Sequence, residues 1–124
     1  MEQVAGLNVR GERSGLLSVV VPAYNEEKSL ALFHERLRDV VDKIPMETEI
    51  IYVNDGSTDN TLTVMQRLRN GDQRVGIVSL SRNFGKEIAS TAGLDHTEGD
   101  AVILMDADLQ HPPKMIPVFL EHWR

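Results

Sequence analysis

Four short runs of apolar residues constrain the fold of this chain more than any other feature of its sequence. The runs are Leu16–Val21, Ile50–Val53, Val75–Leu80 and Ala101–Met105, and none of them alternates regularly between apolar and polar residues. A strand with one face in water needs a polar residue at every second position, whereas a strand covered on both faces does not. We therefore expect four buried strands in a sheet that carries helices on both sides.

Segments with helical spacing separate these runs. Their apolar stripes comprise Leu30, Phe33, Leu37, Val40, Val41 and Ile44 before Pro45, then Leu62, Met65 and Leu68, and then the weaker pair Ile88 and Ala92. An alternation of strands and helices favours right-handed crossovers and a parallel sheet. The predicted fold class is α/β, a three-layer αβα arrangement with a mostly parallel, Rossmann-like sheet.

The two ends of the chain differ from this pattern. Residues 1–15 are mostly polar, contain three glycines and show no periodicity, so we expect a flexible lead before a single domain over residues 16–124. Near the other end, Pro112 and Pro113 are expected to begin a last helix, which carries the apolar residues Ile116, Phe119, Leu120 and Trp123. This stripe is expected to pack in the core or against further chain.

The composition argues against several classes of protein. The chain has no cysteine, which excludes a disulfide scaffold, a thiol nucleophile and a zinc–thiolate site. Its net charge of −6 argues against binding to nucleic acid or anionic lipid, which requires a basic face. The longest apolar run is far shorter than the roughly 20 residues of a membrane span, and the N-terminus lacks the apolar core of a signal peptide. We therefore expect this chain to be cytoplasmic, with no nucleic-acid partner.

Polar loops follow all four predicted strands. They are residues 22–27 (PAYNEE), 54–59 (NDGSTD), 81–86 (SRNFGK) and 106–111 (DADLQH). In open parallel sheets, ligands bind beyond the carboxyl ends of the strands, so the functional site is expected where these loops meet. The first loop lacks a Gly-x-Gly-x-x-Gly motif, and Gly85-Lys86 lacks the earlier glycine of a P-loop, which argues against NAD binding and P-loop chemistry.

The two carboxylates of Asp106 and Asp108 follow the fourth predicted strand. Carboxylates this close repel each other unless a cation lies beside them, and oxygen ligands suit Mg²⁺ or Mn²⁺ shared with substrate phosphates. Gln110 offers a further neutral oxygen. The alternative is structural, with Asp106 capping the turn and Asp108 starting a 3₁₀ turn.

Asp55 comes directly after the second predicted strand. In the same loop Ser57 or Thr58 is expected to cap the next helix, with Asp59 in its first turn. Asp55 is not needed for that cap, and its carboxylate could instead accept a hydrogen bond from an N–H group of a nucleobase.

Four other charged residues of the loops have two interpretations each. Glu26 and Glu27 either line the site or are acids in the first turn of the following helix. Lys86 and Arg82 either stabilise phosphate charge or pair with neighbouring carboxylates.

The four histidines give weaker indications of function than the carboxylates do. His111 either reaches the metal or is an ordinary loop residue beside two prolines. His34, His96 and His122 are expected on helix surfaces.

Taken together, the four loops resemble the donor-binding half of the family-two inverting glycosyltransferases with the GT-A fold, over about residues 16–123. The motifs that carry the resemblance are Val20–Glu27, Val53–Asp59, Ser81–Lys86 and Met105–Pro113. The last two are similar to the polyprenyl-phosphate branch, which includes dolichyl-phosphate mannose synthase and bactoprenol-phosphate glucosyltransferases. Four motifs in the right order are far more specific than any one of them.

The resemblance implies a role for each matching position. The residues implied to bind the donor are Pro22, Ala23, Tyr24, Glu26, Val53, Asp55, Lys86, Asp106 and Ala107. Within this set Asp55 would bind the base, and Asp106 would lie by the ribose and diphosphate. Asp106 and Asp108 are the implied catalytic residues, and together with Gln110 they would hold the Mg²⁺ or Mn²⁺ cofactor.

The resemblance also implies partners and a location. The donor would be a UDP- or GDP-sugar and the acceptor a polyprenyl phosphate. Members of the family place their acceptor-binding residues after the Asp-x-Asp strand, and this branch adds C-terminal membrane helices. We therefore expect residues 16–124 to be a donor-binding part truncated before the acceptor half and inactive alone, with the intact protein at the cytoplasmic face of a membrane.

Three alternatives remain open at the level of sequence. A nucleotidyltransferase would also place acidic metal ligands beside a nucleotide, although its first loop is usually Gly-rich and basic. A non-catalytic module that senses a nucleotide sugar, or an inactive fragment, would keep the same donor loops. A receiver-like phosphoacceptor domain would need its acid pair after the first strand, where this chain has Pro-Ala-Tyr.

Overall fold

The computed structural model describes residues 2–4, 7–9, 15–107 and 116–117. Its strands and helices follow in the order β1 (Glu2–Val4), β2 (Leu7–Val9), β3 (Leu16–Ala23), α1 (Leu30–Val41), β4 (Glu47–Asn54), α2 (Thr61–Gly71), β5 (Val75–Ser79), α3 (Lys86–Leu94) and β6 (Ala101–Leu104). The four predicted strands and the first three predicted helices are all present. In the part of the chain that is described, no helix combines the length and the apolar character needed to cross a bilayer.

The six strands of the described residues belong to one sheet, in the order β1-β2-β6-β3-β4-β5. The pairs β6–β3, β3–β4 and β4–β5 are parallel, and the pairs β1–β2 and β2–β6 at one edge are antiparallel. The chain moves from β3 toward β5 on one side and returns to the other side of β3 with β6. Such a reversal of strand order marks the ligand-binding crevice of open α/β sheets, so the topology directs attention to the carboxyl ends of β3 and β6.

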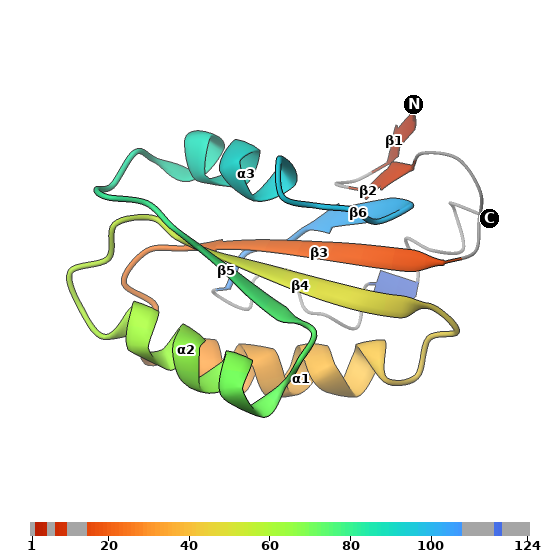
Figure 1. Ribbon diagram of the computed structural model, residues 1–124, viewed down its shortest axis with the longest axis horizontal. Helices are drawn as coiled ribbons and strands as arrows, with labels where there is room; N and C mark the ends of the chain where they lie inside the picture. The colour runs from red at the N-terminus through yellow and green to blue at the C-terminus, as the bar shows by residue number, and fades with distance from the viewer. Residues whose placement is uncertain (1, 5–6, 10–14, 108–115, 118–124) are drawn as a thin grey trace.

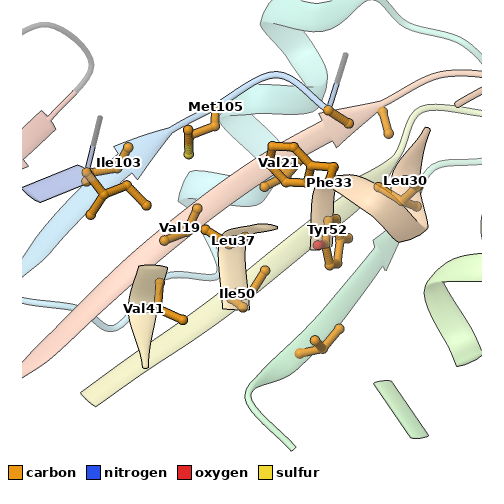
Figure 2. Packing of buried hydrophobic residues seen from close by; sticks show 14 of the residues in the cluster. Val19, Val21, Leu30, Phe33, Leu37, Val41, Ile50, Tyr52, Ile103 and Met105 are labelled. Atoms are coloured by element: carbon orange, nitrogen blue, oxygen red, sulfur yellow. The ribbon is translucent and has the colours of Figure 1, made fainter. Parts of the chain in front are cut away.

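The larger core lies between the sheet and α1. Figure 2 shows Phe33 and Leu37 of α1 against the side chains of Val19, Ile50 and Tyr52, and all five are fully buried. Phe33 and Leu37 are four residues apart, so they lie on the same face of the helix. The long apolar stripe predicted for this helix is therefore confirmed over its central turns.

The opposite face of the sheet carries a smaller core beneath α3 (Figure 1). Its buried members are Val20, Ile51, Val53 and Val102 from the sheet and Ala89 from the helix. With α1 and α2 on one side and α3 on the other, the prediction of a three-layer α/β fold with a mostly parallel sheet is confirmed.

The buried face of α3 is not the one that was predicted. Ile88 is 53% exposed, whereas Ala89 and Gly93 face the sheet. A β-carbon on Gly93 would lie 2.5 Å from Cγ1 of Val20, closer than atoms can approach. The helix packs against the sheet through its smallest side chains, so the apolar pair Ile88 and Ala92 was a misleading signal.

Two short strands, β1 and β2, lie within residues 1–15, for which the sequence predicts a flexible lead. β2 pairs antiparallel with β6, placing Leu7 opposite Ile103 and Val9 opposite Ala101, and β1 pairs with β2. The free edge of β6 supplies backbone partners that a sequence pattern does not reveal.

His34 was predicted on a helix surface and is instead buried, with 3% of its surface exposed. One ring nitrogen lies 2.6 Å from the hydroxyl of Tyr52, and the other lies 3.2 Å from Asp72. Asp72 also accepts from the guanidinium of Arg74, which reaches Asp42 at 2.7 Å. The His34 ring can be buried at little cost in free energy because both of its nitrogens have hydrogen-bond partners.

Candidate functional site

A cavity of about 380 Å³ opens at the carboxyl ends of the central strands. Its lining comes from four segments: Pro22, Ala23, Tyr24 and Glu26 after β3, Asp55 after β4, Asn83, Gly85 and Lys86 before and at the start of α3, and Asp106 and Ala107 after β6. A volume of this size is within the range of small-molecule sites. The structure thus brings together the four loops that the sequence analysis singled out.

Eight of the nine residues predicted to bind the donor line this cavity, and Val53 is the exception. Val53 is fully buried in the smaller core with Val20 and Ala89. Residues alternate between the faces of a strand, so Val53 packs toward α3. The predicted metal ligands Asp108 and Gln110, and the alternative ligand His111, lie outside the described residues.

The buried carboxylate of Asp55 holds the loop that precedes α3. Its Oδ1 accepts a hydrogen bond of 2.8 Å from the backbone nitrogen of Phe84, and its Oδ2 accepts from the backbone nitrogen of Gly85 at 3.1 Å and from Asn83 Nδ2 at 3.2 Å. Hydrogen bonds to an ionised carboxylate are stronger than neutral ones. Asp55 therefore positions one wall of the cavity while also lining it, and nothing in the sequence indicated the first of these roles.

Gly56 allows the same two loops to touch. Its backbone has a φ of +65°, and an added β-carbon would lie 2.0 Å from the carbonyl carbon of Arg82. No side chain fits there. Arg82 itself lies over the ring of Phe84, with 4.4 Å from the guanidinium carbon to the ring centroid, and is not among the residues that line the cavity.

Asn25 joins the loop after β3 to the loop after β4. Its side-chain oxygen accepts a hydrogen bond of 2.8 Å from the backbone nitrogen of Thr58, and its own backbone nitrogen donates to Ser57 Oγ at 3.0 Å. Asn25 has a φ of 53°, a left-handed conformation that asparagine tolerates better than most residues. The sequence analysis did not single out this residue, although an asparagine next to a strand end is a known turn signal.

The start of α2 differs from the prediction. The helix begins at Thr61, and the carboxylate of Asp59 accepts a hydrogen bond of 2.9 Å from the backbone nitrogen of Thr61. The residues predicted to cap the helix, Ser57 and Thr58, instead bind Asn25 in the neighbouring loop. Asp59 therefore binds the first residue of the helix, and Ser57 and Thr58 join the loop after β4 to the loop after β3.

Glu26 and Glu27 precede α1 and are not in its first turn, because the helix begins at Leu30. The carboxylate of Glu26 accepts a hydrogen bond of 2.7 Å from Ser29 Oγ and lies on the cavity wall. The same hydroxyl is 3.4 Å from the carbonyl oxygen of Ala107, so Ser29 connects the loop after β3 with the loop after β6. Sequence reasoning missed Ser29.

Lys86 and Asp106 form an ion pair across the cavity wall. The Lys86 ammonium lies 2.6 Å from each of the two carboxylate oxygens of Asp106. The Asp106 side chain is 19% exposed and the Lys86 side chain 61%. Of the two interpretations of Lys86, the structure shows pairing with a carboxylate.

The charge of the cavity is uneven. Its described lining holds three carboxylates, those of Glu26, Asp55 and Asp106, and one cation, Lys86. Asp55 accepts hydrogen bonds from uncharged backbone and amide N–H groups, whereas both oxygens of Asp106 lie against the charged ammonium of Lys86. Such a wall favours a ligand that brings cationic charge with it, as a metal-bound phosphate compound does.

Comparison with known proteins identifies the family to which this chain belongs. The family model described as "Glycosyl transferase family 2" matches residues 18–124.

Curated relatives agree with this match. The bactoprenol glucosyl transferase of Shigella phage SfX is 46% identical over 108 residues, which cover 87% of this chain and 35% of that protein. An uncharacterized glycosyltransferase of Synechocystis sp. is 48% identical over 108 residues, covering 87% of this chain and 34% of that protein. The chain thus spans about 35% of the length of such relatives.

Solved structures of similar architecture extend the comparison. The glucosyl-3-phosphoglycerate synthase of Mycobacterium tuberculosis, in complex with Mn²⁺, UDP and phosphoglyceric acid, has a TM-score of 0.63 at 31% identity, covering 82% of this chain and 36% of that one. The mannosyltransferase PcManGT of Pyrobaculum calidifontis, in complex with GDP-Man and Mn²⁺, has a TM-score of 0.63 at 28% identity, covering 74% of this chain and 27% of that one. The GT-A architecture expected from the resemblance is confirmed.

Proposed function

The chain belongs to glycosyl transferase family 2, and from this premise we propose that it forms the donor-binding part of an inverting transferase that uses a nucleoside-diphosphate sugar. The observation that carries the proposal is the convergence of four family-like loops on one acidic cavity. Family membership also sets aside the nucleotidyltransferase and receiver-like alternatives.

We propose UDP as the nucleotide of the donor. A carboxylate has about four lone-pair positions, and three of those of Asp55 already accept hydrogen bonds from Asn83, Phe84 and Gly85. Guanine presents two adjacent N–H donors to a carboxylate, whereas uracil presents one. Asp55 has room for one further donor, which fits uracil better.

The cofactor proposed is Mg²⁺ or Mn²⁺, held by Asp106, Asp108 and Gln110. Asp106 supports this assignment because its carboxylate stands on the cavity wall and already binds a cationic group through both oxygens. When bound, a divalent ion neutralises charge on the departing nucleoside diphosphate. Among the described residues no group of three His, Cys, Asp or Glu side chains forms a metal site, so the proposed set depends on Asp108 and Gln110.

The chain's own residues orient the donor. Pro22, Ala23 and Tyr24 form the wall where a nucleoside would lie, and Ala107 also lines the cavity. The backbone of this region is held by the bonds of Asn25 and Ser29, which join neighbouring loops. A site built in this way holds the sugar carbon in line for displacement from the face opposite the diphosphate.

A polyprenyl phosphate is the proposed acceptor. The support is the name of the phage relatives, which are bactoprenol glucosyl transferases. A phosphate acceptor is already anionic, so its attack on the sugar needs less help from a general base than a hydroxyl would. The same relationship supports placing the intact protein at the cytoplasmic face of a membrane, where such a lipid is reached.

Calorimetric titration tests the donor proposal. UDP-, GDP- and dTDP-sugars are titrated with and without Mn²⁺, and we expect metal-dependent binding with UDP preferred. Asp108→Ala should weaken binding at least about tenfold, which corresponds to about 1.4 kcal/mol. Asp95→Ala removes an exposed carboxylate after α3 and serves as the matched control. Binding that ignores the metal, or no binding by a folded sample, would refute the donor site.

A transfer assay separates an enzyme from a sensor. A version of the protein extended to the length of its relatives should move a labelled sugar from the donor to a polyprenyl phosphate. Donor binding of normal strength without transfer would favour a non-catalytic nucleotide-sugar module.

A further inference from the structure

In the ion pair at the cavity wall, the ammonium of Lys86 lies where a metal ion bound to the carboxylate of Asp106 would lie. The Lys86 ammonium lies 2.6 Å from both oxygens of Asp106, so it covers the edge of the carboxylate that a cation would bind. An ammonium and a divalent cation cannot occupy that edge together. Pairing and metal binding therefore compete for one carboxylate.

We propose that Lys86 is the resident counter-ion of Asp106 and gives up this place when the metal-bound donor enters. The released ammonium then pairs with the donor diphosphate. This inference rests on the proposed function, because it assigns Lys86 one partner in the empty site and another in the site that holds the donor.

The position of Lys86 is set by the loop before it. Lys86 is the first residue of α3, and the two residues before it, Phe84 and Gly85, are held through their backbone nitrogens by Asp55. Gly85 has a φ of +100°, a conformation that turns the chain into the helix and that other residues rarely adopt. The base of the side chain is therefore anchored while its end is free to move.

The Lys86–Asp106 ion pair is exposed to water, which makes it easy for Asp106 to exchange the ammonium for a metal ion. The Lys86 side chain is 61% exposed, and ion pairs in contact with water contribute little to stability. The ammonium carries one charge, whereas a divalent ion carries two and interacts more strongly with the same carboxylate. Breaking the pair costs little, and the long flexible lysine side chain can reach a new anion nearby.

The acidic lining explains why a resident cation is useful. In the described lining Lys86 is the one basic residue beside the carboxylates of Glu26, Asp55 and Asp106. Without Lys86, Asp106 would bind a free cation more readily, before any donor arrives. With Lys86 in place, metal binding is favoured when a diphosphate is present to accept the released ammonium.

Mn²⁺ affinity in the absence of nucleotide is the first test. The free Mn²⁺ signal in electron paramagnetic resonance is followed as the chain is titrated, for wild type, Lys86→Met, Lys86→Arg and Lys43→Met. Lys43 is an exposed lysine in the turn after α1, at the far end of the sheet, and controls for the loss of one positive charge. We expect Lys86→Met to bind Mn²⁺ about threefold more tightly or better, the effect of losing an exposed ion pair, while the other two variants stay near wild type.

The second test is UDP affinity at saturating Mn²⁺, where the effect should reverse. Lys86→Met should bind UDP about fivefold more weakly, because the diphosphate loses a charge-assisted partner. A residue that only binds the donor would lower UDP affinity without raising Mn²⁺ affinity.

A direct observation of the side chain completes the test. Lysines are labelled by reductive methylation with ¹³C, and the Lys86 signal is assigned by its absence from Lys86→Met. Mg²⁺ with UDP should shift this signal, leaving that of Lys43 in place. The inference is overturned if the Lys86 signal stays fixed while donor binds, or if Lys86→Met gains no Mn²⁺ affinity over Lys43→Met. A failure of wild type to bind UDP and Mn²⁺ at all would overturn the proposed function as well.

Discussion

Two carboxylates at opposite ends of the sheet are held in different ways. Asp72, at the end where β5 begins, is bound by the guanidinium of Arg74 and lies against His34. Asp55, at the end where β4 finishes, is bound by backbone nitrogens and one amide group. The hydrogen bonds from Arg74 hold the pKa of Asp72 down at about 2, with burial acting in the opposite sense.

This difference separates a structural region from a functional one. Around Asp72 the chain supplies its own cation, because the guanidinium of Arg74 binds both Asp72 and Asp42, so the cluster joins the ends of α1 and α2 to the start of β5. Around Asp55 the chain supplies neutral donors, and its one lysine in the described cavity wall pairs with Asp106. The cavity end therefore keeps net negative charge that a cationic ligand complex can offset.

The largest effect on stability and donor binding is expected from Asp55→Ala, at the end of the sheet that carries the cavity. Asp55→Ala removes the acceptor of three hydrogen bonds in the loop before α3, so the unfolding free energy should fall by about 3 kcal/mol, and UDP binding should be lost with it. Urea denaturation and calorimetry measure the two effects. Asp55→Asn keeps one acceptor oxygen and should lose less stability. A stable Asp55→Ala variant with normal UDP binding would show that the loop does not depend on this carboxylate.

The next largest effect is expected from Asp72→Asn, at the end of the sheet where β5 begins, and it should change stability but not donor binding. Asp72→Asn keeps one acceptor oxygen but removes the charge opposite Arg74, so it should cost about 2 kcal/mol of unfolding free energy. Donor affinity should not change, because the cluster does not line the cavity. A loss of donor affinity in the folded variant would contradict the separation of the two ends.

The pH dependence of stability should reveal His34. Burial lowers the pKa of His34 below its ordinary value, with Asp72 acting in the opposite sense. As the pH falls below about 6.5 the unfolded chain takes up this proton first, so stability decreases, with a slope of at most about 1.4 kcal/mol per pH unit for one proton. Stability is fully present above that pH. Denaturation curves for wild type and His34→Gln between pH 7.5 and 5 measure the slope, and an equal slope in both would exclude His34 as its source.

The smallest effect is expected from Lys86→Met on stability. Its partner Asp106 remains on the cavity wall, and an exposed pair contributes little, so the unfolding free energy should change by less than about 0.5 kcal/mol. Thermal denaturation checks this value. A large loss would mean that the pair supports the fold and is not poised to exchange.

Much of the architecture could be predicted from local patterns. The unalternating runs located β3, β4, β5 and β6, and the stripe of Phe33 and Leu37 located α1. The strand-end rule placed the cavity, since it follows from the parallel direction of the strands and needs no contact information. Weak patterns misled where packing depends on small residues, as at Gly93 in α3, which lies against Val20.

The partners of polar side chains could not be predicted in the same way. Asp55 binds residues 28 to 30 positions away, and His34 finds Asp72 38 positions away. Ser57 and Thr58 matched a helix cap but bind Asn25, because folding brings the neighbouring loop within reach. The contacts of Asp55 and His34 satisfy buried polar groups, whereas those of Asn25 are exposed. In each case the available partner depends on which segments the sheet places side by side.

The sequence by itself determined the α/β class, the parallel sheet and the four loops at its functional end, because periodicity and chain order dictate these through local geometry. Only the tertiary structure decided that Asp55 holds the loop before α3, that Val53 belongs to the core, and that Lys86 covers both oxygens of Asp106. The physical reason is that charges and hydrogen-bond donors choose partners by distance in space, and folding brings together groups that lie far apart along the chain.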